Sequence, residues 1–342
     1  MGLRCPAGVW KTGPVKAWRV HELGEPVKVM RLDDGVDPPR PGPGEIRVAP
    51  STVGLNFFDD LLCRGLYQHK PAPPFSPGVE LCGQVLESGP DVAGFEVGQR
   101  VIGMCSPSAG ALAGETLTDA RLTFAIPDAM PDEVGAAMVV TYGTAHAALH
   151  RRARLQPGET VLVHAGAGGV GSAAIQLAVA GGARVLATAG GPEKVEVCRT
   201  LGAEVAIDYT AGDFVGPVRE ATAGKGVDVV VDPVGGDVFD RSVRCLAWEG
   251  RLVVIGFTSG RIPALPANLA LLKNISVVGL AWGAYLGHDP SLFPAIHDDL
   301  IRLWEQGKVD PLIHTVLPFE EAPQGISDLA SRRTVGKVVV RI

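Results

Sequence analysis

The sequence lacks the cysteine spacing that disulfide frameworks and structural zinc sites need. Its six cysteines are scattered, and no two of them form a CxxC or CxxxxC pair. A structural zinc site needs closely spaced thiols, and a disulfide framework needs several cysteines within a short chain. We therefore expect reduced thiols in a cytoplasmic protein, because the cytosol keeps such thiols reduced.

An excess of positive charge is also missing. The chain has 31 Lys and Arg against 37 Asp and Glu, which gives a net charge of -6. Proteins that hold nucleic acid or an anionic membrane surface depend on a basic field. We accordingly expect no nucleic-acid partner and no membrane partner, and instead a small-molecule substrate.

Two segments could be mistaken for membrane or signal sequences. Residues 161–183 carry no charged side chain and are long enough to span a bilayer. The glycines and His164 within them favour a buried strand, a tight turn and a buried helix instead. Residues 1–14 have neither an apolar signal core nor periodicity, so we expect a disordered extension outside the fold.

The chain divides into stretches of different character. Residues 15–138 contain short alternating apolar runs separated by Pro/Gly clusters, which predicts an antiparallel β-barrel. Residues 139–283 alternate near-continuous apolar runs with helix-length segments, which predicts a parallel sheet covered by helices. Residues 284–342 contain an amphipathic helix and a final strand, from which we expect the chain to return and complete the first domain.

Six apolar runs in the middle stretch predict a doubly wound, Rossmann-type α/β sheet. Helical patterns at 172–180 and 193–201 lie between the runs, as this fold requires. The predicted strands are residues 161–165, 184–189, 204–208, 227–232, 251–255 and 276–279.

The most specific motif is a GxGxxG turn between the first predicted strand and the first predicted helix of this sheet. Glycine permits the tight turn and lets a pyrophosphate approach bare backbone, while the helix N-terminus offers N–H groups and the positive end of its dipole. This context predicts a dinucleotide site. The residues of the turn are Gly166, Gly168, Gly169, Val170 and Gly171.

The residues after the second predicted strand favour NADPH over NADH. NADH enzymes usually place Asp or Glu there to hold the ribose 2′-OH, whereas residues 186–192 contain no carboxylate. Lys194 follows and can pair with a 2′-phosphate, although it could also be a solvated residue of the next helix.

Three segments together resemble the medium-chain dehydrogenase/reductase superfamily, and within it the zinc-free quinone oxidoreductases. They are residues 54–59 (GLNFFD), the glycine turn, and residues 336–340 (GKVVV). The resemblance covers residues 15–342. It implies a GroES-like catalytic domain, formed by 15–138 and 284–342, that is split around an inserted NADPH-binding Rossmann domain, 139–283.

Zinc-dependent members of the superfamily carry three metal ligands that this sequence does not supply. Asn56 stands where the resemblance implies a cysteine, Val79 where it implies a histidine, and residues 135–138 contain no third ligand. Valine cannot bind zinc, and a single amide is not a site. We expect no metal, and hydride transfer to an activated electrophile such as a quinone, because zinc-type alcohol oxidation needs a Lewis acid.

A second branch of the family is also similar. Asn56, Asp59, Gly65 and Tyr67 resemble the NxxD…GxY segment of medium-chain enoyl-thioester reductases. That resemblance implies that Tyr67 donates a proton while NADPH gives hydride to the β-carbon, a task that suits a neutral phenol. Tyr67 could instead only shape the pocket. Asn56 and Tyr67 are the candidate catalytic residues.

Three functions therefore stay open. They are reduction of a quinone or related conjugated carbonyl, reduction of an enoyl thioester, and NADPH binding without catalysis. The third is disfavoured because the segment from Asn56 to Tyr67 is intact.

The resemblance implies further contacts with the cofactor. Thr144 lies in a segment that meets the nicotinamide carboxamide, and Tyr209 corresponds to a tyrosine near the adenosine phosphate. Gly256 and Phe257 follow the fifth predicted strand, at the sheet edge where ligands bind. Lys337 stands where a cationic side chain can reach the cofactor.

The last predicted strand, residues 276–279, is too apolar for an exposed edge of a sheet. We expect a homodimer in which two such edges pair.

Overall fold

The computed structural model describes residues 13–105 and 109–342, so the predicted extension lies almost entirely outside the described residues. The chain forms two compact units, Met1–Val139 with Ile313–Ile342, and Val140–Leu312. The return to the first unit thus follows Leu312 rather than residue 283. The physical reason is that α11 (Leu292–Glu305) packs on α4 (Thr141–His146), where His146 Nε2 lies 2.8 Å from Asp299 Oδ2.

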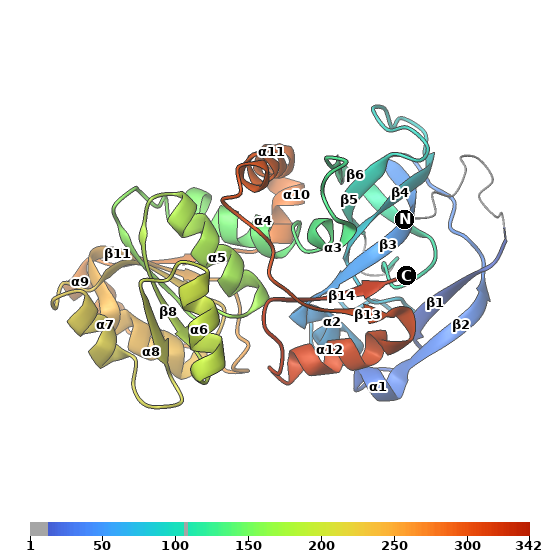
Figure 1. The fold of residues 1–342 in the computed structure, drawn as a ribbon. Coiled ribbons are helices and arrows are strands. Elements are labelled where there is room, and N and C mark those ends of the chain that lie inside the picture. The colour runs from blue at the N-terminus through green and yellow to red at the C-terminus, as the bar shows by residue number, and fades with distance from the viewer. Residues whose placement is uncertain (1–12, 106–108) are drawn as a thin grey trace. The chain divides into compact units, whose positions relative to one another are not determined.

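The sheet of the first unit closes on itself. Its order is β13-β14-β3-β4-β5-β6, and β3 also pairs with β6, so four antiparallel strands form a ring (Figure 1). Burial alternates along the first part of β3, with Ile46 and Val48 fully enclosed, as expected for a strand with one face on a core. The strands are β3 (Glu45–Leu55), β4 (Glu80–Ser88), β5 (Arg100–Cys105), β6 (Thr116–Ala125), β13 (Ile313–Pro318) and β14 (Lys337–Arg341), and a separate ribbon contains β1 (Val15–Val20) and β2 (Met30–Val36).

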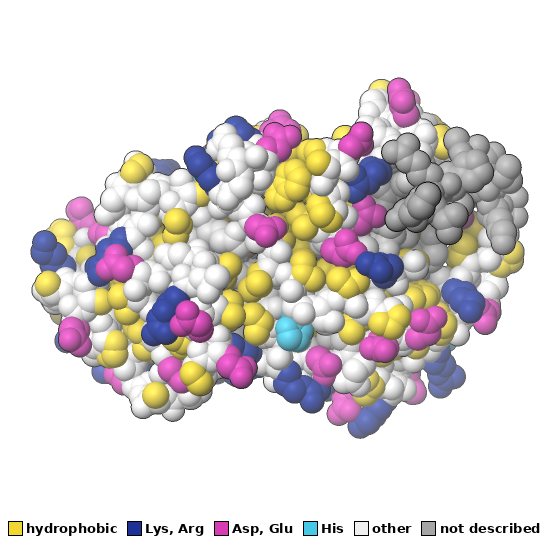
Figure 2. Space-filling model, viewed as in Figure 1, with side chains coloured by type: hydrophobic (Ala, Val, Ile, Leu, Met, Phe, Trp, Pro, Cys, Tyr) yellow, Lys and Arg dark blue, Asp and Glu magenta, His cyan; other side chains and the backbone are white. Residues whose placement is uncertain are grey.

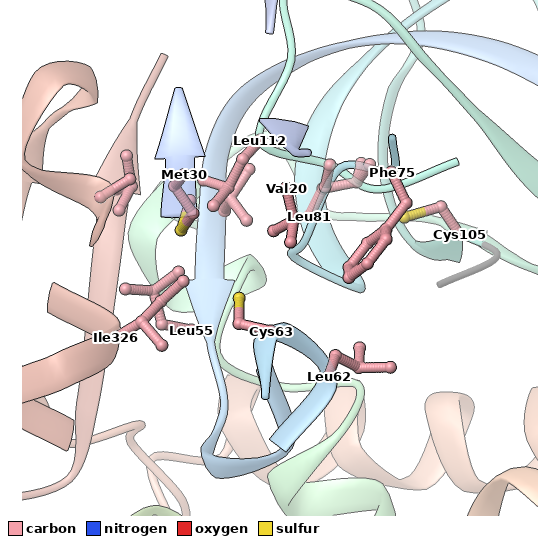
Figure 3. Close-up of a cluster of buried hydrophobic side chains, with 14 of the residues drawn as sticks. Val20, Met30, Leu55, Leu62, Cys63, Phe75, Leu81, Cys105, Leu112 and Ile326 are labelled. Atoms are coloured by element: carbon pink, nitrogen blue, oxygen red, sulfur yellow. The ribbon is translucent and has the colours of Figure 1, made fainter. Parts of the chain in front are cut away.

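An apolar core cluster joins three helices of this unit, α1, α2 and α12, to the strands. Figure 3 shows Cys63 of α2 near Leu55 of β3, with Ile326 of α12 beside Leu55. This packing fixes α2, which begins directly after β3, against the strand that precedes it. The helices are α1 (Pro26–Val29), α2 (Phe57–Cys63), α3 (Asp132–Gly135) and α12 (Ala322–Ala330).

The second unit contains the predicted doubly wound sheet. All its strands are parallel and their order is β12-β11-β10-β7-β8-β9, so the predicted fold is confirmed. Val161, Val230 and Leu252 on its central strands are completely buried, which explains the uninterrupted apolar runs. The strands are β7 (Thr160–Val163), β8 (Arg184–Ala189), β9 (Val205–Asp208), β10 (Val227–Asp232), β11 (Leu246–Val254) and β12 (Ser276–Gly279).

Helices flank this second sheet (Figure 1), namely α5 (Gly169–Ala180), α6 (Pro192–Thr200), α7 (Val215–Ala221), α8 (Gly236–Cys245) and α9 (Ala267–Lys273). The unit also contains α4, the π-helical η1 (Ala147–Arg152), the 3-10 turn η2 (Trp282–Ala284), α10 (Tyr285–His288) and α11. Residues 161–183 form β7, a turn and α5. Within the described ranges, no helix has the length and apolar character needed to cross a bilayer.

Charged side chains of both signs are interspersed on the face shown in Figure 2. This distribution agrees with the mild net charge of the sequence.

Candidate active site

The glycine turn lies at the carboxyl end of β7 and leads into α5. Ala165 adopts a left-handed conformation (φ 51°), and a Cβ atom on Gly171 would collide with the carbonyl oxygen of Ala165. The backbone therefore turns back on itself in a way that only glycine allows at position 171. The N–H groups at the start of α5, from Gly169 to Gly171, have no acceptor within the helix, and groups so placed are able to bind an anion.

The turns that follow β8 and β9 are tied together. Asp208 Oδ1 accepts the N–H of Gly191 at 2.9 Å, and the N–H of Tyr209 donates to Ala189 O at 3.1 Å. The pKa of Asp208 lies below its usual range because the Thr210 hydroxyl and the Gly191 N–H donate to its carboxylate. Tyr209 is half exposed beside Gly190.

Asp208 was not anticipated as a site residue, although it ends the third predicted strand directly before Tyr209. Lys194 lies in the first turn of α6 and is half-buried.

The neighbouring strands also end at this edge. Asp232 at the end of β10 is fully buried, and its Oδ1 accepts the N–H groups of Val234 and Gly235. Burial raises the pKa of Asp232, and its Oδ2 has no hydrogen-bond partner in the described part of the chain. Gly256 follows β11, and Phe257 packs against Gly235, 2.8 Å from an ideal Cβ there.

The predicted residues of the second unit thus gather partly at one edge of its sheet. The glycine turn, Gly256 and Phe257 follow β7 and β11, while Lys194 and Tyr209 flank the turn after β8. Thr144 is buried on α4. Asp232 was missed by sequence reasoning, and its position as the last residue of a predicted strand was the signal that could have found it.

The first unit brings Asn56 and Asp59 together at the start of α2. Asp59 Oδ2 accepts the backbone N–H of Asn56 at 2.7 Å, and Oδ1 accepts that of Gly78 at 3.0 Å. Burial raises the pKa of Asp59 to about 7, while these two bonds and the charge of Lys337 act in the opposite direction.

Tyr67 follows α2 and is half-buried, with its ring 5.4 Å from that of Phe58. Burial raises the pKa of the Tyr67 phenol, and the negative charge of Asp59 adds to this effect. The phenol therefore stays protonated at neutral pH and can donate a proton.

Lys337 begins β14 and its ammonium is enclosed. Nζ donates to Leu55 O at 2.9 Å and to Asn56 Oδ1 at 2.8 Å, and it forms a short ion pair with Glu80 Oε1. Its three N–H bonds thus have acceptors within the first unit. The contact between Lys337 and a cofactor stays a prediction.

The side chains at the implied zinc-ligand positions do not supply a set of zinc ligands. Val79 is buried and apolar, and the amide oxygen of Asn56 accepts from Lys337. No cluster of three His, Cys, Asp or Glu side chains with metal-binding geometry occurs among residues 13–105 and 109–342. The residues present at this position do not fit a zinc ion.

Two protein-family models match this chain, one in each unit. Residues 42–128 match "Alcohol dehydrogenase GroES-like domain" and residues 169–300 match "Zinc-binding dehydrogenase". The rat protein "Quinone oxidoreductase-like protein 2" is 41% identical over 98% of this chain and 95% of its own length. The chain belongs to the medium-chain dehydrogenase/reductase superfamily.

Solved structures of this superfamily share the fold. The Escherichia coli quinone oxidoreductase complexed with NADPH superimposes with a TM-score of 0.87 at 28% identity, covering 96% of this chain and 100% of that chain. The CurK enoyl reductase gives a TM-score of 0.86 at 30% identity, covering 96% and 99%. The predicted combination of a GroES-like domain and a Rossmann-type sheet is confirmed.

Proposed function

We propose that this protein is an NADPH-dependent reductase that transfers hydride to a quinone or related conjugated carbonyl without zinc. One observation carries the proposal: the glycine turn of residues 166–171 opens α5 at the carboxyl end of β7 in a member of this superfamily. NADPH is the cofactor bound in the E. coli relative.

NADPH supplies the hydride when it is bound, and the second unit holds it. The N–H groups of Gly169 to Gly171 and the dipole of α5 bind the pyrophosphate. Lys194 and Tyr209 flank the turn after β8, where a ribose 2′-phosphate is accommodated. Asp208 Oδ1 accepts the N–H groups of Gly191 and Thr210 and the Thr210 hydroxyl, and these bonds hold the two turns together.

Zinc independence rests on the side chains of the first unit. Val79 offers no donor atom, and the Asn56 amide is held by Lys337 and Glu80. The neutral Tyr67 phenol is the candidate proton donor, and quinone reduction needs less help from such a donor than enoyl reduction does.

A second candidate is reduction of an enoyl thioester. The half-buried Tyr67 phenol favours it, because protonation of the α-carbon needs a proton donor and a phenol is protonated at working pH. The similarity to an enoyl reductase adds support.

The experiment that tests these functions is NADPH oxidation followed by absorbance. Purified protein is given 1,4-naphthoquinone, crotonyl-CoA or no acceptor, each with NADPH or NADH. The quinone should give the highest kcat/KM. Faster turnover of crotonyl-CoA would replace the first proposal by the second, and NADPH binding with no turnover of either acceptor would contradict both.

We further propose a cytoplasmic homodimer. Cys63, Cys82, Cys105, Cys198 and Cys245 are unpaired and buried, which suits a reducing compartment. The edge strand β12 exposes 40% of Val277, and an apolar edge of this kind is commonly covered by a second chain.

A further inference from the structure

Three oxygen atoms of the first unit converge on one cation, and that cation belongs to the chain. Leu55 supplies a backbone carbonyl, Asn56 an amide oxygen and Glu80 a carboxylate oxygen, and all three accept from Lys337 Nζ. Carbonyl, amide and carboxylate oxygens are the donors that bind hard cations in proteins. We propose that this cluster is a cation site filled by the Lys337 ammonium, and that it binds a free primary ammonium ion when the lysine side chain is shortened.

Burial distinguishes this cluster from a surface ion pair. The side chains of Lys337 and Glu80 are 3% and 0% exposed. Removal of one partner of a buried ion pair is strongly destabilising, because the remaining charge is left uncompensated in the interior. Loss of the Lys337 ammonium should therefore destabilise the first unit.

The oxygens are held in place by further bonds. Asn56 Nδ2 donates to Glu80 Oε1 at 2.9 Å and to Gly54 O at 3.2 Å, which directs its Oδ1 toward the ammonium. Gly54 leaves the space that Glu80 fills, since a Cβ atom at position 54 would lie 2.9 Å from Glu80 Oε1. The site is thus built by β3, β4 and β14 before any ligand arrives.

The cluster lies where the family resemblance implies a metal ligand. A lysine ammonium contacts the side chain at that position, Asn56. Lys337 is accordingly a positioning residue: it fixes Asn56, which begins α2. This inference concerns the stability of the first unit and is measured without turnover, so its failure and that of the proposed reductase activity are distinguishable.

Chemical rescue of Lys337→Ala tests the proposal. The substitution removes three carbons and the ammonium, which n-propylammonium supplies again. We expect the Tm of the full-length variant to fall by on the order of 10 °C. It should then rise saturably with n-propylammonium chloride, less with methylammonium, and not with tetramethylammonium, which has no N–H donor, at equal ionic strength. The parent protein is the control and should respond equally to all three salts.

A double-mutant cycle keeps the proposal testable if Lys337→Ala does not fold. Lys337→Met with Glu80→Gln removes both charges, and this double variant should melt at a higher temperature than Lys337→Met alone. A soluble Lys337→Ala variant with the parent Tm, or one with equal responses to all three salts, would overturn the proposal. So would a double variant that is less stable than Lys337→Met.

Discussion

The hydroxyl oxygen of Tyr209 lies so close to Gly190 that a Cβ atom at position 190 would come within 2.7 Å of it. Tyr209 also donates its N–H to Ala189, and Asp208 next to it holds Gly191. The turn after β8 is therefore shaped for residues without side chains. An acidic residue that grips a ribose 2′-OH would not fit at position 190 without moving Tyr209.

This arrangement predicts that NADPH binds at least tenfold more tightly than NADH, a difference of about 1.4 kcal/mol. Lys194→Ala should reduce the preference by weakening NADPH binding and sparing NADH, because only the 2′-phosphate pairs with the ammonium. Fluorescence titration with both cofactors measures this. Arg199→Ala, on the same helix and paired with Glu196, is the matched control. Equal affinities for the two cofactors in the parent protein would contradict the predicted preference for NADPH.

The glycine turn predicts a position-specific effect of added side chains. Gly171→Ala would place a Cβ against Ala165 O, so α5 must shift. Its N–H groups would then no longer point toward the pyrophosphate. We expect NADPH affinity to fall by about tenfold or more, or about 1.4 kcal/mol. Gly212→Ala, where an added Cβ meets no atom within 4 Å, should bind NADPH as the parent does. Unchanged affinity in Gly171→Ala would mean that the turn does not hold the cofactor.

Sequence patterns predicted many strands and helices of both units, because the local order of apolar and polar residues reflects which side chains are buried. The mainly apolar segments 184–189 and 227–232 correspond to β8 and β10, most of whose residues are buried. Contacts between distant residues were not accessible in this way. Lys337 and Glu80 are 257 positions apart, and only the pairing of β14 with β3 and of β3 with β4 brings them together.

The same limit explains the domain boundary. The amphipathic pattern of α11 gives its apolar face but not its partner, and the partner, α4, belongs to the second unit.

The raised pKa of Asp59 predicts that the free energy of unfolding depends on pH. Burial raises the pKa of its carboxyl to about 7, above the unfolded value near 3.8, so the folded protein binds a proton that the unfolded chain releases. Stability should therefore decrease as pH rises from about 4 to 7 and level off above, with a slope of at most about 1.4 kcal/mol per pH unit. Comparison of urea unfolding of the parent and Asp59→Asn between pH 4 and 8 isolates this contribution.

The controls for Asp59 are the neighbouring charges. Asp60→Asn removes a carboxylate that pairs with Arg64 at 2.9 Å and keeps Asp59 in place, so it tests for a general effect of net charge. A difference between the parent and Asp59→Asn that does not vary with pH would contradict the raised pKa.

If Tyr67 is a proton donor, its substitution should affect the turnover of two substrates to different extents. Tyr67→Phe removes the proton donor and keeps the ring next to Phe58. Turnover of crotonyl-CoA should fall by about 100-fold or more, since general acid catalysis contributes that much, whereas turnover of a quinone should change by less than about threefold. Phe58→Leu controls for lost ring packing. An equal loss with both substrates in Tyr67→Phe would assign the tyrosine to pocket shape.

The open edge of β12 predicts a homodimer that a single proline can dissociate. Leu280 donates its N–H to Val254 of the neighbouring strand, and the alternation of N–H directions along a strand places that of Val277 on the open side. Val277→Pro therefore removes a donor from the edge and preserves the pairing with β11, while Val278→Pro removes an N–H that faces β11 and should lower stability as well. Light scattering at micromolar concentration should give twice the 35.7 kDa chain mass for the parent and the single chain mass for Val277→Pro. A parent protein that is monomeric throughout that range would contradict the proposed homodimer.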